Sequence, residues 1–171
     1  MAPAYRHVYA HFPFCDVICH YCDFYTARAK GARQEEFFGA LNKEAKLALP
    51  NMPPKLEALY MGGGTPGISP LPLLESFLGN FRDRISPKTE VTIEANPTSI
   101  TPELVKAWAD MGINRVSLGI QSLDDKTLKR LGRVHSGKVA LNALATVARF
   151  IPNVTGDLIY GVPEQGVGDP S

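Results

Sequence analysis

Short runs of β-favouring residues alternate five times with longer helical segments, and this alternation constrains the fold more than any other feature. The strand-like runs cover residues 7–12, 58–61, 90–95, 115–120 and 154–160. Between them, apolar residues recur at three- and four-residue spacing, as in Phe37, Leu41 and Ala45. Strands joined by crossover helices pair in parallel, because the helix returns the chain to the same end of the sheet. The sequence therefore predicts an α/β fold of about five parallel β/α units.

Helix start and stop signals agree with this periodicity. The remaining apolar faces at helical spacing are Leu71/Leu74/Phe77/Leu78/Phe81, Leu104/Trp108/Met111 and Val139/Leu144/Val147/Ile151. Thr101 offers a capping hydroxyl before Pro102, and Gly112 stands where that helix would stop. Ser122 and Ser136 resemble two further helix starts. We therefore expect four helices, each covering the sheet with one apolar face.

The chain has the length of one domain and shows no linker or low-complexity segment. Residues 161–171 follow the fifth strand with neither a covering helix nor a sixth strand. We therefore expect an open, C-terminally truncated barrel. Lys and Arg number 18 against 17 Asp and Glu, so no polyanion partner such as nucleic acid is expected. No run approaches the roughly 18 apolar residues of a membrane span, so we expect a cytoplasmic protein.

The strongest chemical signal is Cys15, Cys19 and Cys22, which fall within eight residues in a CxxxCxxC spacing. Thiolates are the ligands that iron–sulfur clusters require, and one short loop can hold three irons of a [4Fe-4S] cluster. The fourth iron then stays open to chelate the amino and carboxylate groups of S-adenosylmethionine. Reduction of that sulfonium yields a 5′-deoxyadenosyl radical. The alternatives are a zinc site completed by His20 or His11, and three unrelated cysteines.

A second signal is the run Gly62-Gly-Gly-Thr-Pro66, which follows the second strand directly. Glycines permit close backbone approach, and exposed amides there can bind a carboxylate or an amino acid backbone. The alternative is an ordinary tight turn. Further polar residues stand at or near the ends of the later strands, namely Glu94, Gln121 and Asp157. Parallel α/β barrels place their active sites at this edge, although each residue alone could be a cap or a salt-bridge partner.

Three more residues are candidates for the same site. Tyr9 shares a strand face with His11, and the alternative role for both is barrel lining. Tyr21 lies beside Cys22, where it could close over a cluster, stack on adenine or pack locally. Arg133 could pair with a cofactor carboxylate, or it could be a solvated charge at a helix end.

Six segments together carry a family resemblance. They are Tyr9-Ala-His-Phe-Pro-Phe-Cys15, the cysteine loop, Gly62-Gly-Gly-Thr-Pro66, Thr92-Ile-Glu-Ala-Asn-Pro97, Ser117-Leu-Gly-Ile-Gln-Ser122 and Asp157-Leu-Ile-Tyr-Gly-Val-Pro163. With these the chain resembles the oxygen-independent coproporphyrinogen III oxidase family of radical S-adenosylmethionine (SAM) proteins. The resemblance implies a partial TIM-like radical SAM (β/α)6 barrel, with residues 1–171 forming the core domain and a C-terminal domain missing. It also implies a [4Fe-4S] cluster and SAM as cofactors.

The resemblance assigns roles to individual residues. It implies that Tyr9, Gly63 and Glu94 face one bound SAM. Six further residues match positions that the decarboxylating enzyme uses for a second SAM, namely Tyr21, Gly64, Thr65, Gln121, Arg133 and Asp157. The cluster ligands would be the three cysteines, and the resemblance leaves the catalytic residues unassigned.

Within this family the chain is more similar to the heme-chaperone branch than to the oxidase. Phe24 stands where the oxidase has a fourth cysteine, and Leu131-Gly-Arg-Val-His135 is similar to the chaperone pattern. This branch implies a carrier that binds heme and delivers it to acceptor proteins. The alternative is an enzyme that decarboxylates coproporphyrinogen III to protoporphyrinogen IX. A third class, radical modification of RNA, is disfavoured by the balanced charge.

Overall fold

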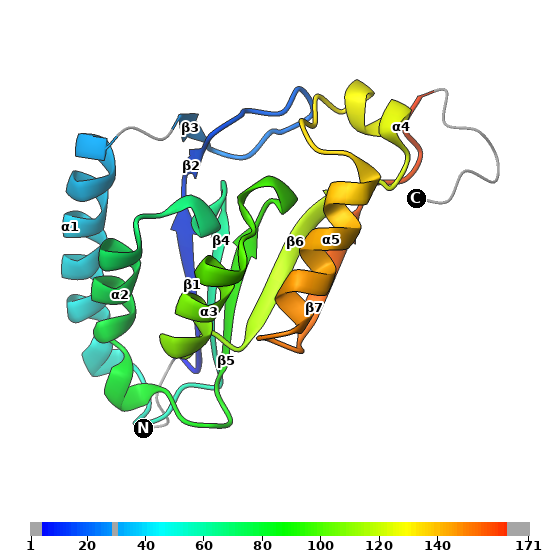
Figure 1. The fold of residues 1–171 in the computed structure, drawn as a ribbon. Coiled ribbons are helices and arrows are strands. Elements are labelled where there is room, and N and C mark those ends of the chain that lie inside the picture. Colours follow the sequence, from blue (N-terminus) through cyan, green and yellow to red (C-terminus); the bar gives the residue numbers. More distant parts are fainter. Residues whose placement is uncertain (1–4, 29–30, 164–171) are drawn as a thin grey trace.

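The computed structural model describes residues 5–28 and 31–163, and its centre is a five-stranded parallel sheet (Figure 1). The strands are β1 (His7–Phe12), β4 (Ala58–Gly63), β5 (Glu90–Ala95), β6 (Arg115–Gln121) and β7 (Val154–Leu158), and they lie side by side in this order. All four pairings are parallel. The predicted five parallel β/α units are therefore confirmed, and the carboxyl ends of the strands share one edge.

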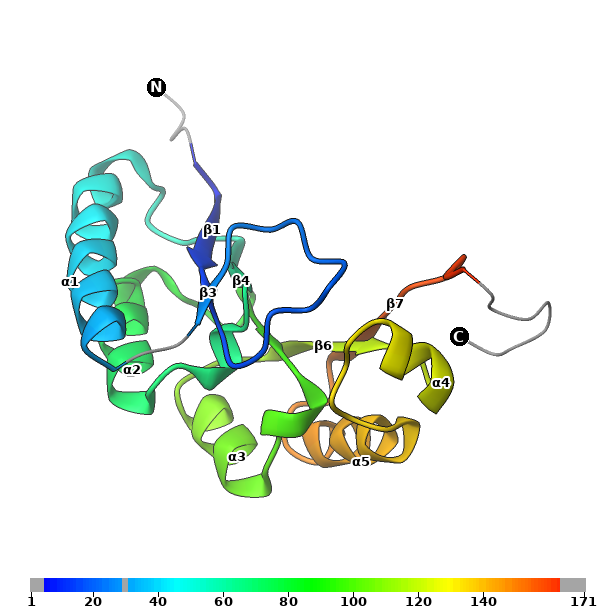
Figure 2. The same ribbon diagram turned by 90° about the horizontal axis from the view of Figure 1, so that it is seen from above.

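Four helices cover one face of this sheet. They are α1 (Gly31–Ala48), α2 (Leu71–Gly79), α3 (Pro102–Asp110) and α5 (Gly137–Ala148). Figure 2, seen along the sheet from its carboxyl edge, shows them as an arc on the outer side of the strands. A short helix, α4 (Asp125–Arg130), lies between β6 and α5. No helix in the part of the chain that the structure describes is long and apolar enough to cross a bilayer.

The hydrophobic core lies between the sheet and this arc of helices. Trp108 of α3 is fully buried there, and the Phe12 ring meets the Phe38 and Phe77 rings edge to face at 5.4 and 5.5 Å. Aromatic side chains bury on the order of 150–250 Å² each, and edge-to-face pairs add a further preference in geometry. These contacts fix α1 and α2 against β1.

The opposite face of the sheet is polar. On β5, Val91 and Ile93 are fully buried against the helices, while Thr92 and Glu94 alternate with them. Successive side chains of a strand point to opposite faces, so alternate positions line the inner side of the open barrel. This inner face carries the candidate functional residues.

Three predicted helix signals are confirmed in the structure. The Thr101 hydroxyl accepts a hydrogen bond from Leu104 N at 3.2 Å, and the Ser136 hydroxyl accepts one from Val139 N at 3.3 Å. Gly112 follows α3 with φ of +90°, a conformation that favours glycine. Helix α3 therefore begins and ends, and helix α5 begins, where the sequence pattern placed them.

The helix start predicted at Ser122 is wrong by two residues. Asp124 caps α4 instead, because its carboxylate accepts a hydrogen bond from Thr127 N at 2.7 Å. Ser122 supports this cap from one step away, where its hydroxyl accepts from Asp124 N at 3.0 Å. The Ser122 and Asp124 side chains thus each accept a hydrogen bond from one backbone N–H group at the start of α4.

Gly39→Ala is expected to stabilise the protein. Gly39 is exposed within α1, and an added Cβ would meet no atom within 4 Å. Alanine in a helix interior is favoured over glycine by roughly 0.5–1 kcal/mol because it restricts the unfolded chain. Urea unfolding should therefore show a free energy of unfolding higher by about that amount, and a decrease would contradict the helical environment described for this position.

Candidate functional site

A cavity of about 510 Å³ opens at the carboxyl edge of the sheet, beneath the loop that carries the cysteines. It contains every candidate residue except Tyr9: Cys15, Cys19, Tyr21, Cys22, Gly63, Gly64, Thr65, Glu94, Gln121, Arg133 and Asp157. These residues come from segments up to 142 positions apart, between Cys15 and Asp157. The parallel topology brings most of them together at the carboxyl edge of the sheet, and Arg133 reaches the same place from the loop that follows α4.

A small second sheet pins the cysteine loop above the cavity. Strand β2 (Phe14–Cys15) pairs in parallel with β3 (Ala27–Arg28), so both ends of the loop are held together. Ala27 N also donates to Pro13 O at 2.7 Å. Figure 2 shows the loop, in blue, passing over the carboxyl edge of the main sheet. The three thiols are thereby presented to the cavity from one side.

Two of the three thiols receive hydrogen bonds from one continuous polar network. The Arg133 guanidinium donates to Cys19 Sγ at 3.2 Å, to Asn96 Oδ1 at 2.6 Å and to the Gly119 carbonyl at 2.8 Å. Asn96 Nδ2 donates to the Thr65 hydroxyl at 3.1 Å, and that hydroxyl lies 3.5 Å from Cys15 Sγ as a donor. Donors on sulfur stabilise thiolates, which are the form that binds metal.

Burial acts against this effect at Cys15. Removal from solvent raises the pKa of the Cys15 thiol, while the Thr65 hydrogen bond lowers it. The sulfur is therefore a thiol that gives up its proton when a metal replaces it, so metal binding at this site releases protons.

The donor set fits an iron–sulfur cluster better than zinc completed by a histidine. His11 Nε2 lies 3.0 Å from the Tyr25 carbonyl and His11 Nδ1 lies 3.2 Å from the Tyr9 hydroxyl, so both ring nitrogens are engaged. The His20 ring lies against Gly132. Among residues 5–28 and 31–163, no three His, Cys, Asp or Glu side chains gather closely enough to hold a single ion. Three thiols facing one cavity are the ligands that a cluster requires.

Glu94 is fixed by two donors on the inner face. Its Oε1 accepts from the Tyr60 hydroxyl at 2.7 Å, and its Oε2 accepts from Gly63 N at 3.0 Å. Burial and the adjacent Glu94 carboxylate raise the pKa of Tyr60, so the phenol stays protonated and remains a donor. The Glu94 carboxylate is therefore oriented by two donors, and it lines the cavity.

Asp157 is held in the same way from the neighbouring strand. The Ser117 hydroxyl lies 3.0 Å and 3.1 Å from its two carboxylate oxygens, and Thr155 Oγ1 donates to Ser117 Oγ at 3.1 Å. Two oriented carboxylates, Glu94 and Asp157, thus line one cavity. Such a pair suits a ligand that carries hydroxyl groups and positive charge.

The expectation of exposed amides in the glycine run is wrong. Gly63 N donates to Glu94, Gly64 N donates to the Phe12 carbonyl at 2.7 Å, and Thr65 N donates to the Phe14 carbonyl at 2.8 Å. The chain entering the cysteine loop runs directly alongside the glycines and occupies the Gly64 and Thr65 amides. The glycines therefore serve the close approach of two backbones.

Tyr9 lies outside the cavity lining. It is 60% exposed on the edge strand β1, and its ring stacks on Tyr60 with centroids 6.0 Å apart. Its hydroxyl is 3.2 Å from His11, as expected for residues on one strand face. Tyr9 therefore reaches the site through Tyr60, which in turn holds Glu94.

Tyr21 lies in the cavity close to Cys19 and Arg133. Burial, opposed by Arg133, raises the pKa of Tyr21 to about 12, so its phenol stays protonated.

Sequence reasoning missed several residues that the site uses, namely Tyr60, Asn96, Ser117 and Gly119. Tyr60 and Ser117 alternate with buried strand residues, and that period of two could have placed them on the inner face. Asn96 directly follows β5, the kind of position that identified the other candidates. Its hydrogen bonds to two partners from distant segments are visible only in the folded chain.

Arg133→Gln is expected to weaken metal binding by about 10- to 100-fold, because groups that orient metal ligands commonly contribute that much to affinity. The change removes the donor to Cys19 and the clamp on Asn96. Iron release to a chelator from the reconstituted protein measures it. Lys129→Gln, an equal charge change on exposed α4, is the matched control and should leave iron release unchanged. Equal release rates in both variants would contradict the role of the network.

Comparison with known proteins gives one family match and several close relatives. The sequence profile of the Radical SAM superfamily matches residues 9–170. The chain is 39% identical over 169 residues to the heme chaperone HemW of Mycobacterium tuberculosis, and the alignment covers 95% of this chain and 43% of that protein. It is 36% identical over 165 residues to mitochondrial radical S-adenosyl methionine domain-containing protein 1 of Bos taurus, with 94% and 37% covered.

Among solved structures, the coproporphyrinogen III oxidase HemN of Escherichia coli superposes with a TM-score of 0.83 at 23% identity. The superposition covers 95% of this chain and 39% of HemN. At this identity the match concerns the fold. The chain thus spans about two fifths of the length of the relatives that it matches.

Proposed function

The chain belongs to the radical SAM superfamily, and on that premise we propose that it is the core of a heme chaperone that binds heme and transfers it to acceptor proteins. The proposal includes residues 1–171 as the core domain of a longer protein, with a cytoplasmic location. It is supported by the identity to HemW proteins over nearly the whole chain, which ranges from 30 to 39%.

One observation on this chain carries the choice of carrier over decarboxylase. Thr65 and Arg133 match positions that the decarboxylating enzyme uses for a second SAM, yet here both donate hydrogen bonds to the cysteine sulfurs. Arg133 also uses its second terminal nitrogen on Asn96 and on Gly119. Because Thr65 and Arg133 are already engaged with the cysteine loop, they favour a site for one SAM molecule. In this proposal the cluster and its SAM gate the binding of heme.

In this proposal each part of the site has a defined task. When bound, the cluster supplies an open iron that chelates SAM and a source of single electrons. Cys15, Cys19 and Cys22 would hold it. Glu94, fixed by the Tyr60 phenol, would accept hydrogen bonds from ligand hydroxyl or amino groups.

The other residues that we assign to SAM contact or support are Tyr9, Tyr21, Gly63, Gly64, Thr65, Gln121, Arg133 and Asp157. Asp157 offers a second negative charge for a ligand with a positive sulfonium. Tyr21 would cover the ligand and exclude water from the thiols. Tyr9 would act through the Tyr60 ring.

Heme titration of the protein tests the carrier function. We expect saturable heme uptake, seen as a shifted Soret band, and movement of that heme to an added apo-hemoprotein. Failure of the protein to bind heme, with its cluster intact, would remove the carrier reading. Acceptors are identified by their gain of the heme spectrum.

The second candidate function is oxidation of coproporphyrinogen III, which the superposition on HemN favours at the level of fold. An anaerobic assay of the reduced protein with SAM discriminates between the two functions. Formation of protoporphyrinogen IX would establish the enzyme and overturn the carrier. SAM stoichiometry is an independent readout, with one molecule per cluster expected for the carrier.

A further inference from the structure

Gln121 has an unusual backbone conformation at the end of β6. Its φ of +66° is the only positive φ at a non-glycine residue in the described parts of the chain. Ser122 N donates to the Ile120 carbonyl at 2.8 Å, which closes a tight three-residue turn with Gln121 at its centre. Non-glycine residues avoid this region because the side chain crowds the backbone, and they persist there only where the surroundings enforce it.

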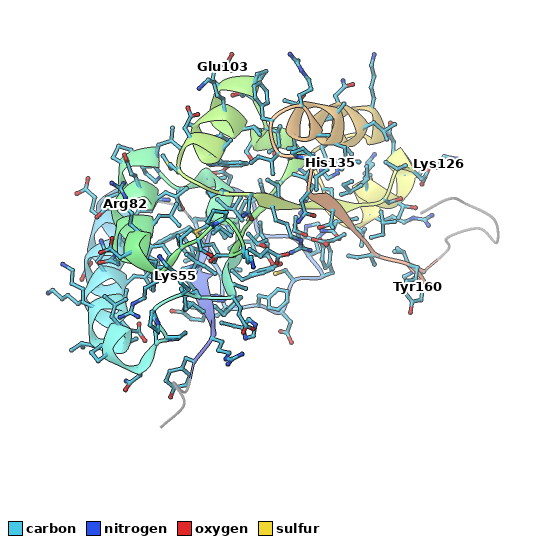
Figure 3. The ribbon with its side chains drawn as sticks, turned by 90° about the horizontal axis from the view of Figure 1, so that it is seen from below. Lys55, Arg82, Glu103, Lys126, His135 and Tyr160 are labelled. Carbon is cyan, nitrogen blue, oxygen red and sulfur yellow. The ribbon has the colours of Figure 1, made fainter. Side chains whose placement is uncertain are left out.

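The surroundings of this turn include a buried histidine. His135 is 7% exposed, and its Nε2 lies 2.9 Å from the same Ile120 carbonyl. Figure 3 shows His135 between α5 and the sheet. On the other side, Ile159 N donates to the Gln121 carbonyl at 2.9 Å. The turn is therefore held by His135, from the loop between α4 and α5, on one side and by Ile159, which directly follows β7, on the other.

The protonation of His135 follows from its partner. A carbonyl oxygen can only accept, so Nε2 carries the ring proton. Burial lowers the pKa of His135, so the ring is neutral near pH 7. The charged groups facing it are Arg133, which acts in the same direction as burial, and Asp125, which opposes it.

The bond from His135 is not needed to satisfy a buried carbonyl. The Ile120 carbonyl oxygen already accepts a hydrogen bond from Ser122 N. The additional bond from His135 Nε2 therefore acts mainly on the orientation of the Ile120 carbonyl. Two donors on one oxygen fix the orientation of that peptide group. The next residue along the chain is Gln121, whose direction depends on that peptide.

The direction of Gln121 matters because its side chain lies in the crowded part of the cavity. A Cβ on Gly119 would stand 2.9 Å from Gln121 Nε2, 3.2 Å from Asn96 Oδ1 and 3.5 Å from the Arg133 guanidinium. The Gln121 amide therefore lies close to the network that reaches the cysteine sulfurs. A small rotation of the turn would move this amide away from it.

We propose that His135 is a positioning residue that holds the strained turn at Gln121 and thereby aims the Gln121 amide at bound SAM. The aim toward SAM rests on the proposed function, in which Gln121 contacts that cofactor. The hold on the turn rests only on the geometry of this chain.

The first experiment tests the turn without any cofactor. Glycine tolerates positive φ, so Gln121→Gly removes the strain that His135 opposes. We expect His135→Phe, which keeps ring volume and removes the donor, to lower the urea midpoint in the wild-type background and to lower it much less in Gln121→Gly. An equal loss in both backgrounds would show that His135 only fills space, and would overturn the proposal.

The second experiment tests the purpose of the turn. His135→Phe is expected to weaken SAM binding to the reconstituted protein about tenfold, as for the loss of one hydrogen bond. His135→Gln restores a side-chain N–H donor and should recover most of the affinity. In a Gln121→Ala background, His135→Phe should have no further effect on affinity, and an equal weakening there would contradict action through the Gln121 amide.

The two experiments separate the proposal from the function on which part of it rests. Coupling in the unfolding experiment without any SAM binding by the wild type would overturn the proposed function and the aim toward SAM, and would support the hold on the turn. SAM binding without coupling would leave the proposed function standing and would overturn the role of His135.

Discussion

Replacing Cys22 by alanine is expected to abolish assembly of a four-iron cluster while the protein stays folded. Cys22 is only partly buried on the loop over the cavity, so the substitution removes a ligand and little packing. Two thiols cannot keep a cubane with one open iron, because two irons then lack a protein ligand in place of one. Iron content after anaerobic reconstitution should fall from about four to less than about one per chain.

Ile18→Ala is the matched control for this result. Ile18 lies on the same loop and lines the same cavity, and its more exposed side chain carries no ligand atom. The control should keep the cluster and its paramagnetic resonance signal, and that signal should change when SAM is added. Full iron loading of Cys22→Ala would show that the cluster does not depend on this thiol, and uptake of zinc alone by the wild type would contradict an iron–sulfur site.

Most of the main sheet could be predicted from the sequence, because its signals are local. β1 and β5 have the predicted bounds, while β4 and β6 continue by one or two residues and β7 ends two residues early. Strand ends depend on which neighbours are present to pair. Alternation of apolar and polar residues identifies a strand, but it does not count the hydrogen bonds at its last residues.

The support of the cysteine loop could not be predicted, because β2 and β3 are two residues each and pair across eleven intervening positions. Such short segments carry no periodicity. The use of the glycine amides was missed for the same reason. The partners of the Gly63, Gly64 and Thr65 amides are Glu94 and the Phe12 and Phe14 carbonyls, and all three come from other parts of the chain.

The location of the candidate site follows from the topology of the sheet, while its hydrogen-bond network does not. The cysteines, the glycine run, Glu94, Gln121 and Asp157 were identified by their places at or near strand ends, and the shared edge of a parallel sheet brings such places together. The order of hydrogen bonds from Arg133 through Asn96 and Thr65 to Cys15 joins four separate segments. These hydrogen bonds decide whether Arg133 contacts a cofactor or a thiol, and they form only in the folded chain.

The same hydrogen-bond network also connects the cysteine thiols to the rest of the site. Arg133 and His135 belong to one short segment, and they reach the thiols and the Gln121 turn respectively. We therefore expect a change in this segment to affect both metal retention and ligand orientation.

Gly64→Ala is expected to destabilise the protein by about 3 kcal/mol, at the upper end of the usual cost of overpacking. A Cβ at this position would stand 2.7 Å from the Phe14 carbonyl oxygen and 2.9 Å from the Phe12 carbonyl oxygen. Both atoms are backbone and cannot rotate away. Relief requires breaking the bonds from Gly64 N and Thr65 N that tie the glycine run to the cysteine loop.

Urea unfolding measures this cost, and proteolysis within residues 16–26 reports whether the loop is released. Gly39→Ala is the matched control, because its added Cβ meets open space and the same substitution should there raise stability. A Gly64→Ala protein that unfolds at the wild-type midpoint and resists proteolysis equally would contradict the close approach of the two backbones. A released loop would also lose iron faster, because the glycine run then no longer holds the strand that carries Cys15 in place.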